Sequence, residues 1–322
     1  MTDASDPAQV RPPPRVVILM ATRNGARWLP GQLQSLREQS LRDWALWVGD
    51  DGSTDETPAI LEAFRAAESD RHEIRLLAGP RQGAAQNFLA LLTHPDLPTG
   101  PGIHVALSDQ DDIWLPGKLA RGLEHLAALP DPQRPAIYGA QSVHLDEAGR
   151  VVGRSRRPRR PLCIGNAVVQ NLISGHSSML NPAAVRLARQ AGCPPGIGFQ
   201  DWWLSLLVIA AGGTAVVDGE TVLFYRQHGR NVMGAPQGVL AHARRIRALF
   251  GHDYARWIAA NLAGLASGRV PLTPEARTIV ARLAEPARPG LARPRMLRAL
   301  GIHRQSGFAT AMLYLAAALG RV

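Results

Sequence analysis

The sequence predicts an α/β protein with a mostly parallel central sheet and helices on both faces of that sheet. Short continuous apolar runs alternate with segments whose apolar residues recur at helical spacing. Acidic clusters directly follow two of the apolar runs, as expected at the ligand-binding edge of such a sheet. The chain has 322 residues, which is enough for one large domain or two smaller ones.

The first segments predict a β-α-β unit followed by a second helix. Residues 16–20 are uniformly apolar, which is typical of a strand buried on both faces of a parallel sheet. Apolar residues recur at helical spacing over residues 27–39, and residues 44–48 again have the pattern of a strand. We expect Thr54 to be the N-cap of a helix over residues 57–67.

The same alternation continues to the middle of the chain and then becomes looser. Further strands are expected at residues 74–77, 103–107, 136–143, 150–153 and 221–226, and further helices at 84–92, 116–129, from 182 onward, 201–211, 238–250 and 308–319. The apolar stretch 202–217 is interrupted at Gly212 and Gly213 and is too short to span a membrane, so it predicts a buried helix that leads into a strand. Segment 308–319 is also too short to span, and we expect it to be buried or inserted into a surface.

Two acidic clusters are the strongest functional indication in the sequence. Residues 50–55 read Asp-Asp-Gly-Ser-Thr-Asp, and residues 108–112 read Ser-Asp-Gln-Asp-Asp. Each cluster follows a predicted strand, and ligands of α/β sheets gather at the carboxyl ends of the strands. The pattern predicts a site for a divalent cation and a nucleotide, and therefore chemistry on an activated phosphate compound.

The two clusters suggest different ligands. In the first, Asp51 is placed to accept the imide N–H of uracil or thymine, although the cluster could also serve only to cap the next helix. In the second, Asp109 and Asp111 project on one side if the chain is extended, with Gln110 opposite. Paired carboxylates match the coordination of Mg²⁺ or Mn²⁺, and a solvated acidic turn is the alternative.

Two later positions are also candidates. Asp201 stands at the start of an apolar helix, where an aspartate either caps the helix or deprotonates a hydroxyl group in a cleft. His228 and Asn231 follow a predicted strand, and both side chains are able to bind a metal or a phosphate. A structural role for the histidine is the alternative.

Taken together, these motifs resemble family 2 glycosyltransferases with the GT-A fold. The resemblance covers residues 16–234 and is carried by Ala-Thr-Arg-Asn-Gly at 21–25, the 50–55 cluster, Asp-Gln-Asp-Asp-Ile-Trp at 109–114 with Lys118, Asp201 before Trp202, and His228 with Asn231. The wording of the second cluster and the Tyr-Arg-Gln-His segment at 225–228 are similar to a rhamnosyltransferase-like branch that builds bacterial polysaccharide and O-antigen.

The resemblance implies a role for each matching residue. It implies that Thr22 and Asp51 hold the nucleoside and that Asp201 is the catalytic base of an inverting transfer. It implies Mg²⁺ or Mn²⁺ as cofactor, with Asp109, Asp111 and His228 as its ligands. The expected nucleotide-sugar site comprises Thr22, Arg23, Asn24, Asp51, Asp109, Lys118, His228 and Asn231. The chain departs from many members by carrying Gln200 in place of glutamate and Arg23 in place of an aromatic residue.

The expected organisation follows from the same resemblance. Residues 16–115 are expected to bind a dTDP- or UDP-linked sugar, with rhamnose as one candidate, and residues 116–234 to bind a saccharide or lipid-linked saccharide acceptor. The competing hypothesis is a GT-A-like binding protein without turnover, whose basic tail docks on anionic lipid or nucleic acid.

Two groups of residues bear on the acceptor. The loop 154–160 carries five arginines and is expected either to clamp acceptor phosphates or to be a mobile, solvated loop. Residues 171–181 include Gly175, His176 and Ser177 between apolar ends, and they either line an acceptor pocket or pack in the core.

The net charge of +10 is concentrated near the C-terminus. Residues 1–234 carry 23 basic and 23 acidic side chains, whereas residues 235–322 carry 13 arginines and three acidic residues. A basic helical extension of this kind attracts anionic surfaces, and an anionic membrane is the expected partner. The alternative is that arginine merely fills solvated helix faces, since 35 of the 36 basic residues are arginine. Nothing in this segment resembles a nucleic-acid-binding module, so no nucleic acid partner is expected.

The remaining features concern location. Residues 1–15 lack the apolar stretch of a signal peptide, and we expect a disordered tail. Cys163 and Cys193 have neither the spacing of a zinc site nor that of a disulfide framework. The sequence predicts a cytoplasmic protein, with peripheral association at the inner face of the cytoplasmic membrane.

Overall fold

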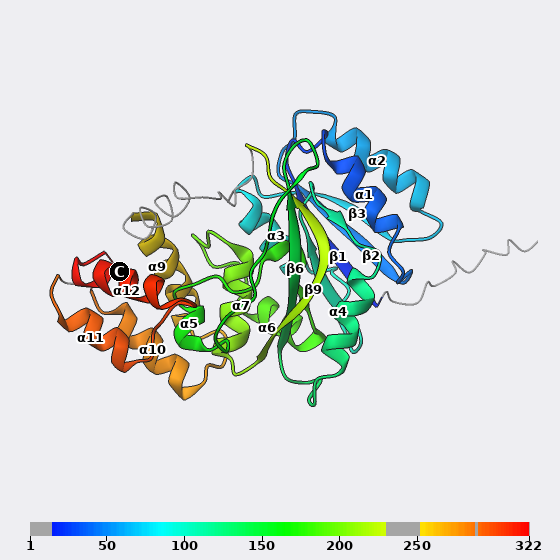
Figure 1. Cartoon of the computed structure of the whole chain (residues 1–322). Coiled ribbons are helices and arrows are strands. Elements are labelled where there is room, and N and C mark those ends of the chain that lie inside the picture. Colours follow the sequence, from blue (N-terminus) through cyan, green and yellow to red (C-terminus); the bar gives the residue numbers. More distant parts are fainter. Residues whose placement is uncertain (1–14, 230–251, 287–288, 322) are drawn as a thin grey trace, which may run out of the picture.

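The computed structural model describes residues 15–229, 252–286 and 289–321 (Figure 1). Three predictions lie outside these residues: the tail before residue 15, the helix at 238–250 and the placement of Asn231.

A nine-stranded mixed sheet forms the centre of the molecule. Its strands are β1 (Val16–Thr22), β2 (Trp44–Asp50), β3 (Ile74–Ala78), β4 (His104–Ser108), β5 (Ile113–Trp114), β6 (Ala136–Leu145), β7 (Val151–Arg154), β8 (Met179–Leu180) and β9 (Thr214–Arg226). They lie in the order β3-β2-β1-β4-β8-β6-β9-β5, with β7 paired to β6. The strands β1 to β4 are mutually parallel, while the short β8 runs antiparallel to both β4 and β6. The carboxyl ends of β1, β2, β4, β6 and β9 therefore meet at one edge of the sheet.

Helices cover both faces of this sheet. One apolar layer packs under α1 (Leu29–Arg37), α2 (Thr57–Glu68) and α4 (Lys118–Ala127). The other packs under α3 (Ala84–Thr93), α6 (Pro182–Ala191) and α7 (Gln200–Ala210). Alternate residues of β1 enter the two layers, because successive side chains of a strand point to opposite faces. This alternation explains why β1 is apolar at nearly every position.

The predicted elements are largely confirmed, with differences at some ends. Thr54 is not the N-cap of α2, because its hydroxyl and backbone N–H both bond to Asn24, and Asp55 accepts the Thr57 N–H at 3.0 Å instead. Asn181 is an N-cap as expected, and its side chain accepts the Ala184 N–H at 2.8 Å. Four short elements before residue 229 were not predicted: β5, β8, the helix α5 (Ile164–Ala167) and the 3₁₀ turn η1 (Gly175–Ser177). In the C-terminal extension, which was expected to be helical, the helices at 252–266, 274–284 and 292–299 were not predicted individually.

A charged cluster around the buried Asp218 joins α4 to the sheet. The carboxylate of Asp218 on β9 accepts hydrogen bonds from Arg121 at 2.9 Å and from the Tyr138 hydroxyl at 2.9 Å. Burial by itself raises the pKa of Asp218, but the bonds from Arg121, the Glu220 backbone and Tyr138 lower it below the usual value of 3.8. The charged form of Asp218 therefore stabilises the fold.

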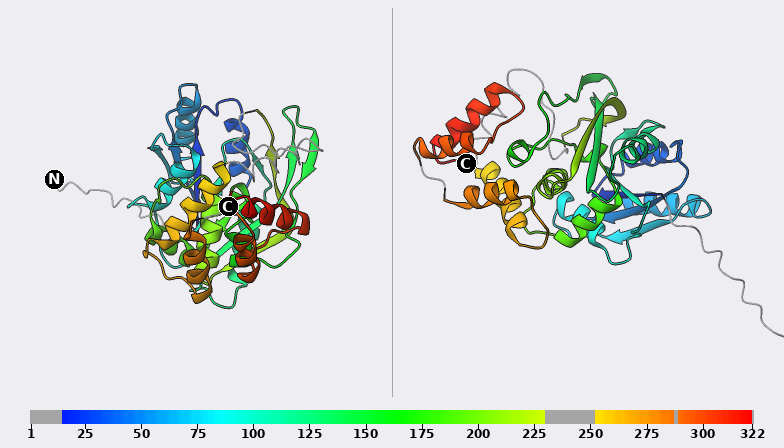
Figure 2. Two further views of the ribbon diagram at one scale, coloured as in Figure 1. Left: turned by 90° about the vertical axis from the view of Figure 1, so that its left-hand side faces the viewer. Right: turned by 90° about the horizontal axis from the view of Figure 1, so that it is seen from below.

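The last quarter of the chain forms a helical group at the end of the molecule farthest from α1 and α2 (Figures 1 and 2). It contains α9 (His252–Ala266), α10 (Pro274–Ala284), α11 (Ala292–Ala299) and α12 (Gly307–Ala318). The turn before α12 packs tightly on α5, since a Cβ on Gly165 would lie 2.5 Å from the Gly301 carbonyl oxygen. Among the described helices, none has the combined length and hydropathy needed to cross a membrane.

The helix α12 is apolar on two sides but only one of them is covered. Leu313, Ala316 and Ala317 are fully buried. Phe308 and Leu315, seven residues apart and so on one face, keep 60% and 47% of their surface exposed. The expectation that this segment is buried is therefore correct for one face only.

Candidate functional site

The acidic segment after β4 lies against the end of β1. Gln110 fixes this contact, because its side-chain oxygen accepts the Arg23 N–H at 2.9 Å and its amide donates to the Arg23 carbonyl at 3.1 Å. Gly25 makes room for it, as a Cβ there would overlap the Gln110 amide. The two strand ends thus share one site, and Gln110 points toward β1, away from the cluster that its neighbours form.

The residues predicted to hold the nucleoside line the neighbouring ends of β1 and β2. The Thr22 hydroxyl donates to the Gly49 carbonyl at 3.3 Å, and Thr22 is buried. Asn24 adopts a positive φ of 48°, and its side chain accepts the Thr54 N–H at 2.8 Å. The Arg23 side chain is exposed. Thr22 and Asn24 therefore shape the loop between β1 and the first acidic cluster.

Asp51 has an unexpected set of partners. One carboxylate oxygen accepts the Arg81 N–H at 2.6 Å, and the other accepts the Gly83 N–H at 2.8 Å. Asp51 is only 3% exposed. It therefore holds the turn after β3 at the sheet edge, and any base N–H must use a remaining lone pair of an oxygen that already accepts a bond.

Asp111 and His228 form a pair across the site. The His228 Nε2 atom lies 2.7 Å from the Asp111 Oδ2 atom, although the two residues are 117 positions apart. The imidazole also stacks on Trp28, with the ring centroids 5.9 Å apart. The guanidinium groups of Arg27 and Arg226 lie 4.2 and 4.8 Å from the Trp28 ring centroid. His228 thus lies between the Asp111 carboxylate and the Trp28 ring, and two guanidinium groups lie against that ring.

A second group contains Asp109, Asp112 and His176. One potential ligand atom from each residue lies within 4.8 Å of the others. Burial, together with the charges of Asp111 and Asp201, raises the pKa of Asp109 to about 7. Burial and the charges of Asp109 and Asp111 raise the pKa of Asp112 as well. The closeness of these carboxylates makes the charged cluster unfavourable unless a cation is present.

The residues of this group fit a divalent cation. Asp112 is fully buried, and neither of its oxygens forms a hydrogen bond of normal geometry with the described residues. The Arg226 backbone gives it only weak stabilisation. The His176 Nε2 atom is likewise buried without a partner in the described part of the chain, and burial lowers the His176 pKa to about 3, which leaves the imidazole neutral. Carboxylate oxygens and a neutral imidazole are suitable ligands for Mn²⁺, and carboxylates are suitable for Mg²⁺.

The group of side chains that could hold a cation therefore overlaps only in part with the ligands expected from the sequence, Asp109, Asp111 and His228. Asp109 belongs to the group of three, while Asp111 and His228 bond to each other. Asp112 and His176 were not predicted as ligands. Asp112 could have been predicted as a ligand, because it extends the acidic run at 109–112. The spacing of residues in the sequence gives no sign that His176 lies beside Asp112.

Lys118 lies next to the same acidic cluster. It is 2% exposed, and its ammonium group is 3.2 Å from the Trp114 ring centroid. Burial lowers the pKa of Lys118 well below its usual value, although Asp112 and Asp109 oppose that change. Its charge in turn lowers the pKa values of both carboxyl groups. The positive charge of Lys118 therefore partly offsets the negative charge of the acidic cluster.

Asp201 faces this cluster from the first turn of α7. Its Oδ2 atom accepts the Gly175 N–H at 2.8 Å and its Oδ1 atom accepts the Trp202 N–H at 2.8 Å. Burial raises the pKa of Asp201, and the bonds from Asn171 and these backbone groups oppose the rise. Phe199 rather than Asp201 occupies the N-cap position. The helix start therefore does not need this aspartate as a cap.

The structure thus brings together most of the residues singled out in the sequence. The residues that interact around the acidic cluster are Asp109, Asp111, Asp112, Lys118, His176, Asp201 and His228. Thr22, Arg23, Asn24 and Asp51 lie at the adjoining strand ends. Trp28 was expected only as part of a helix face, and its contact with His228 is new.

Comparison with known families gives one match. Residues 17–143 match the model of Glycosyl transferase family 2. A dTDP-rhamnosyl transferase, RfbG of Shigella flexneri, is 27% identical over 241 residues, which cover 70% of this chain and 78% of that protein. The putative glycosyltransferase EpsE of Bacillus subtilis is 30% identical over 136 residues, covering 42% of this chain and 46% of EpsE.

Solved structures show the same fold. A mannosyltransferase of Pyrobaculum calidifontis, in complex with GDP-Man and Mn²⁺, superimposes with a TM-score of 0.52 at 21% identity and covers 95% of this chain and 86% of its own. The S. aureus TarS fragment 1–349, in complex with UDP-GlcNAc, gives a TM-score of 0.52 at 14% identity over 94% of this chain and 89% of its own. The fold is GT-A, as the sequence predicted.

Proposed function

Because residues 17–143 match the model of Glycosyl transferase family 2, we propose that this chain moves a sugar from a pyrimidine nucleotide diphosphate to a hydroxyl group of a saccharide or lipid-linked saccharide. The product would belong to a bacterial surface polysaccharide. The observation that supports this most strongly is the approach of Asp201 to the acidic segment after β4, where its charge raises the Asp109 pKa.

The ends of β1 and β2 are the proposed donor site. Thr22, Arg23, Asn24 and Asp51 surround the place where the nucleoside would lie, beside the acidic segment that would face its diphosphate. The relative RfbG is named for dTDP-rhamnose, and the TarS fragment was solved with UDP-GlcNAc. The Pyrobaculum calidifontis mannosyltransferase was solved with GDP-Man, so the fold itself also accepts a purine nucleotide. The likeness to RfbG therefore supports the proposal of a pyrimidine nucleotide, with rhamnose or a UDP-linked hexose as the sugar.

A divalent cation is the proposed cofactor. Asp109, Asp112 and His176 are the residues that would hold it, with Asp111 and His228 directly beside them. When bound, Mg²⁺ or Mn²⁺ offsets the negative charge that develops on a departing diphosphate. Trp28 keeps the His228 ring in place against Asp111 through stacking.

Asp201 is the proposed general base. Its carboxylate is held by two backbone N–H groups, so its position is fixed before an acceptor arrives. Its raised pKa makes it a better proton acceptor than an exposed aspartate. Removal of the proton from the acceptor hydroxyl would drive a single displacement, and one displacement inverts the anomeric configuration.

The C-terminal helices are the proposed contact with an anionic membrane, at the cytoplasmic face. Four of the five large apolar side chains that are exposed in the described residues lie at positions 291, 308, 315 and 319. Exposed arginines of α11 and the chain end lie in the same segment. Apolar side chains that insert at the interface, together with arginines that meet anionic headgroups, are the pattern of peripheral binding.

A donor panel tests the proposed function. Thermal unfolding is followed with dTDP-rhamnose, UDP-glucose, UDP-GlcNAc and GDP-mannose, each with and without Mn²⁺, and release of the nucleoside diphosphate is then measured. We expect a pyrimidine nucleotide sugar to raise the melting temperature more in the presence of Mn²⁺. If no nucleotide sugar stabilises the chain, and anionic vesicles or DNA do, the non-catalytic binding protein is the better interpretation.

A further inference from the structure

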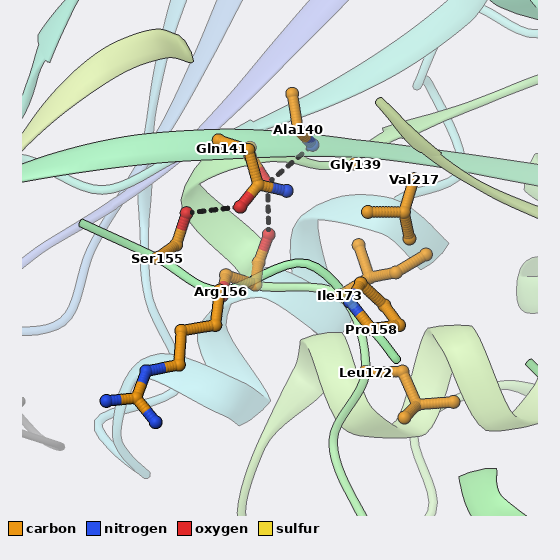
Figure 3. A pocket seen from close by; sticks show the side chains of 11 residues that line it. Gly139, Ala140, Gln141, Ser155, Arg156, Pro158, Leu172, Ile173 and Val217 are labelled. Carbon is orange, nitrogen blue, oxygen red and sulfur yellow. Dashed lines mark hydrogen bonds between the residues drawn. The ribbon is translucent and has the colours of Figure 1, made fainter. Parts of the chain in front are cut away.

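A pocket lies beside the segment 172–177, which also contacts Asp201 through the Gly175 N–H. It is an open pocket whose empty space, counted together with the adjoining solvent, is about 290 Å³, and it is lined by the loop after β7, by the segment 172–177 and by β6 and β9. Figure 3 shows Gln141 and Ser155 at its polar end and Ile173 and Val217 at its apolar end. An apolar wall with a few fixed polar groups is typical of a small-molecule site.

One wall of this pocket also holds the proposed base. Ser174 lines the pocket, and the next residue, Gly175, donates its backbone N–H to Asp201. A Cβ on Gly175 would lie 3.0 Å from the Gln200 amide nitrogen and 3.3 Å from the Asp201 Cβ atom. The segment 172–177 therefore packs directly on the start of α7, with the pocket on one of its sides.

The loop after β7, which lines part of the pocket, is strongly basic. Residues 148–200 contain no aspartate or glutamate, and the loop 154–160 carries five arginines, all exposed. Among the described residues, no carboxylate forms an ion pair with any of the five. The Arg157 guanidinium packs on Gly219 of β9, where a Cβ would overlap it. The side chain of Arg156 extends away from the other side chains that line the pocket (Figure 3), and it is exposed.

The basic loop is held in place by the C-terminal helical group. The side-chain oxygen of Gln305 accepts the N–H groups of Arg159 and Arg160, each at 2.8 Å. Its amide nitrogen donates to the Arg160 carbonyl at 3.3 Å and to the Asn166 side chain at 2.5 Å. These bonds fix the loop backbone, so a ligand does not have to order it first.

We propose that this pocket binds the acceptor saccharide and that the acceptor carries a negative charge, on a phosphate or a carboxylate group, which meets the arginine loop. The inference rests on the proposed function in taking Asp201 as the base. The two sequence hypotheses for the acceptor, the arginine clamp and the 171–181 segment, meet here, because both segments contribute residues that line this pocket. Guanidinium groups bind phosphate and carboxylate through paired N–H bonds, which favours a charged sugar over a neutral one.

The test measures binding of simple probes to the full chain at low salt. Saturation-transfer difference NMR is recorded with glucose 1-phosphate, methyl glucuronide and neutral methyl glucoside, and inorganic phosphate serves as competitor. Three variants are compared. The first is a double variant that combines Arg156→Gln with Arg157→Gln. The second is Gly219→Ala, whose methyl group would displace the Arg157 guanidinium, and the third is Gln305→Ala. The matched control is Arg186→Gln, an exposed arginine that bonds to Gln133 at 3.1 Å before the amino end of β6.

We expect at least one charged sugar to bind better than methyl glucoside, and the double variant to weaken that binding roughly tenfold or more. Gly219→Ala and Gln305→Ala should weaken it in the same direction, and the control should not. The two charged probes separate phosphate from carboxylate recognition. The proposal is overturned if neither charged sugar binds, if methyl glucoside binds equally well, if inorganic phosphate binds as tightly as glucose 1-phosphate, or if the double variant binds like the control.

The donor site is followed separately in the same samples, through calorimetry of UDP with Mn²⁺. If the unaltered chain does not bind UDP with Mn²⁺, that result would count against the proposed function. It would leave the result for the sugar probes unchanged, since those are measured without nucleotide.

Discussion

Replacing Asp201 with asparagine separates proton transfer from the rest of the reaction. The side chain keeps its size, but it loses its negative charge and one of its two acceptor oxygens. Both oxygens of Asp201 accept backbone N–H bonds at 2.8 Å, so either the Gly175 or the Trp202 N–H must face an NH₂ group in the variant. The change therefore has a chemical and a structural consequence, and the two differ in size.

The chemical effect is the larger. A positioned general base contributes about 10²–10⁴ in rate, which corresponds to about 3–5 kcal/mol at 1.36 kcal/mol per tenfold. Loss of one hydrogen bond to the carboxylate costs about 1.5–3 kcal/mol of folding free energy. That second cost lowers the melting temperature by several degrees but leaves most of the protein folded at 25 °C. We expect Asp201→Asn to reduce sugar transfer at least a hundredfold, with donor affinity nearly unchanged.

The assay measures nucleoside diphosphate release in the presence of acceptor, and calorimetry measures donor binding with Mn²⁺. Asp131→Asn is the matched control, because Asp131 is exposed and caps a turn before the amino end of β6 by accepting the Gln133 N–H at 2.9 Å. The control should keep full activity. If Asp201→Asn retains more than a tenth of the transfer rate, the residue is not the base. If donor binding is lost along with transfer, Asp201 belongs to the donor site instead.

Three further predictions follow from other parts of the molecule. EDTA should stop turnover and Mn²⁺ or Mg²⁺ should restore it, while Asp112→Asn should weaken Mn²⁺ binding at least tenfold by calorimetry; full activity in chelator would contradict the metal role. Because the folded pKa of Asp218 is lowered, its stabilisation is present above pH 4 and is lost as the pH falls through the folded pKa. Asp218→Asn should then reduce the free energy of unfolding by about 1–3 kcal/mol at pH 7 and flatten its fall below pH 4; urea unfolding with an unchanged acid slope would refute this. Phe308→Ser with Leu315→Ser should reduce binding to phosphatidylglycerol vesicles tenfold or more in sedimentation, whereas Val151→Ser, the fifth exposed apolar side chain, should not; equal binding by both variants would exclude α12 from the membrane contact.

The sequence by itself determined the order of the main elements and the acidic edge. Parallel strands such as Val16–Thr22 are covered by helices on both faces, so nearly every residue of the strand is apolar. Such uniformly apolar runs can be recognised directly in the sequence. The acidic residues that follow such runs reach one edge because parallel strands end on the same side. The positions of Asp51, Asp109 and Asp111 relative to the fold were therefore predictable.

Only the tertiary structure decided which side chains face one another at that edge. His228 meets Asp111 across 117 positions, and His176 meets Asp109 and Asp112 from a turn that has no pattern in the sequence. The tether from Gln305 to the arginine loop is of the same kind. Partners of this sort depend on the directions in which loops leave the strands. Those directions are set by packing and by bonds to distant backbone groups, which leave no periodic trace in the sequence.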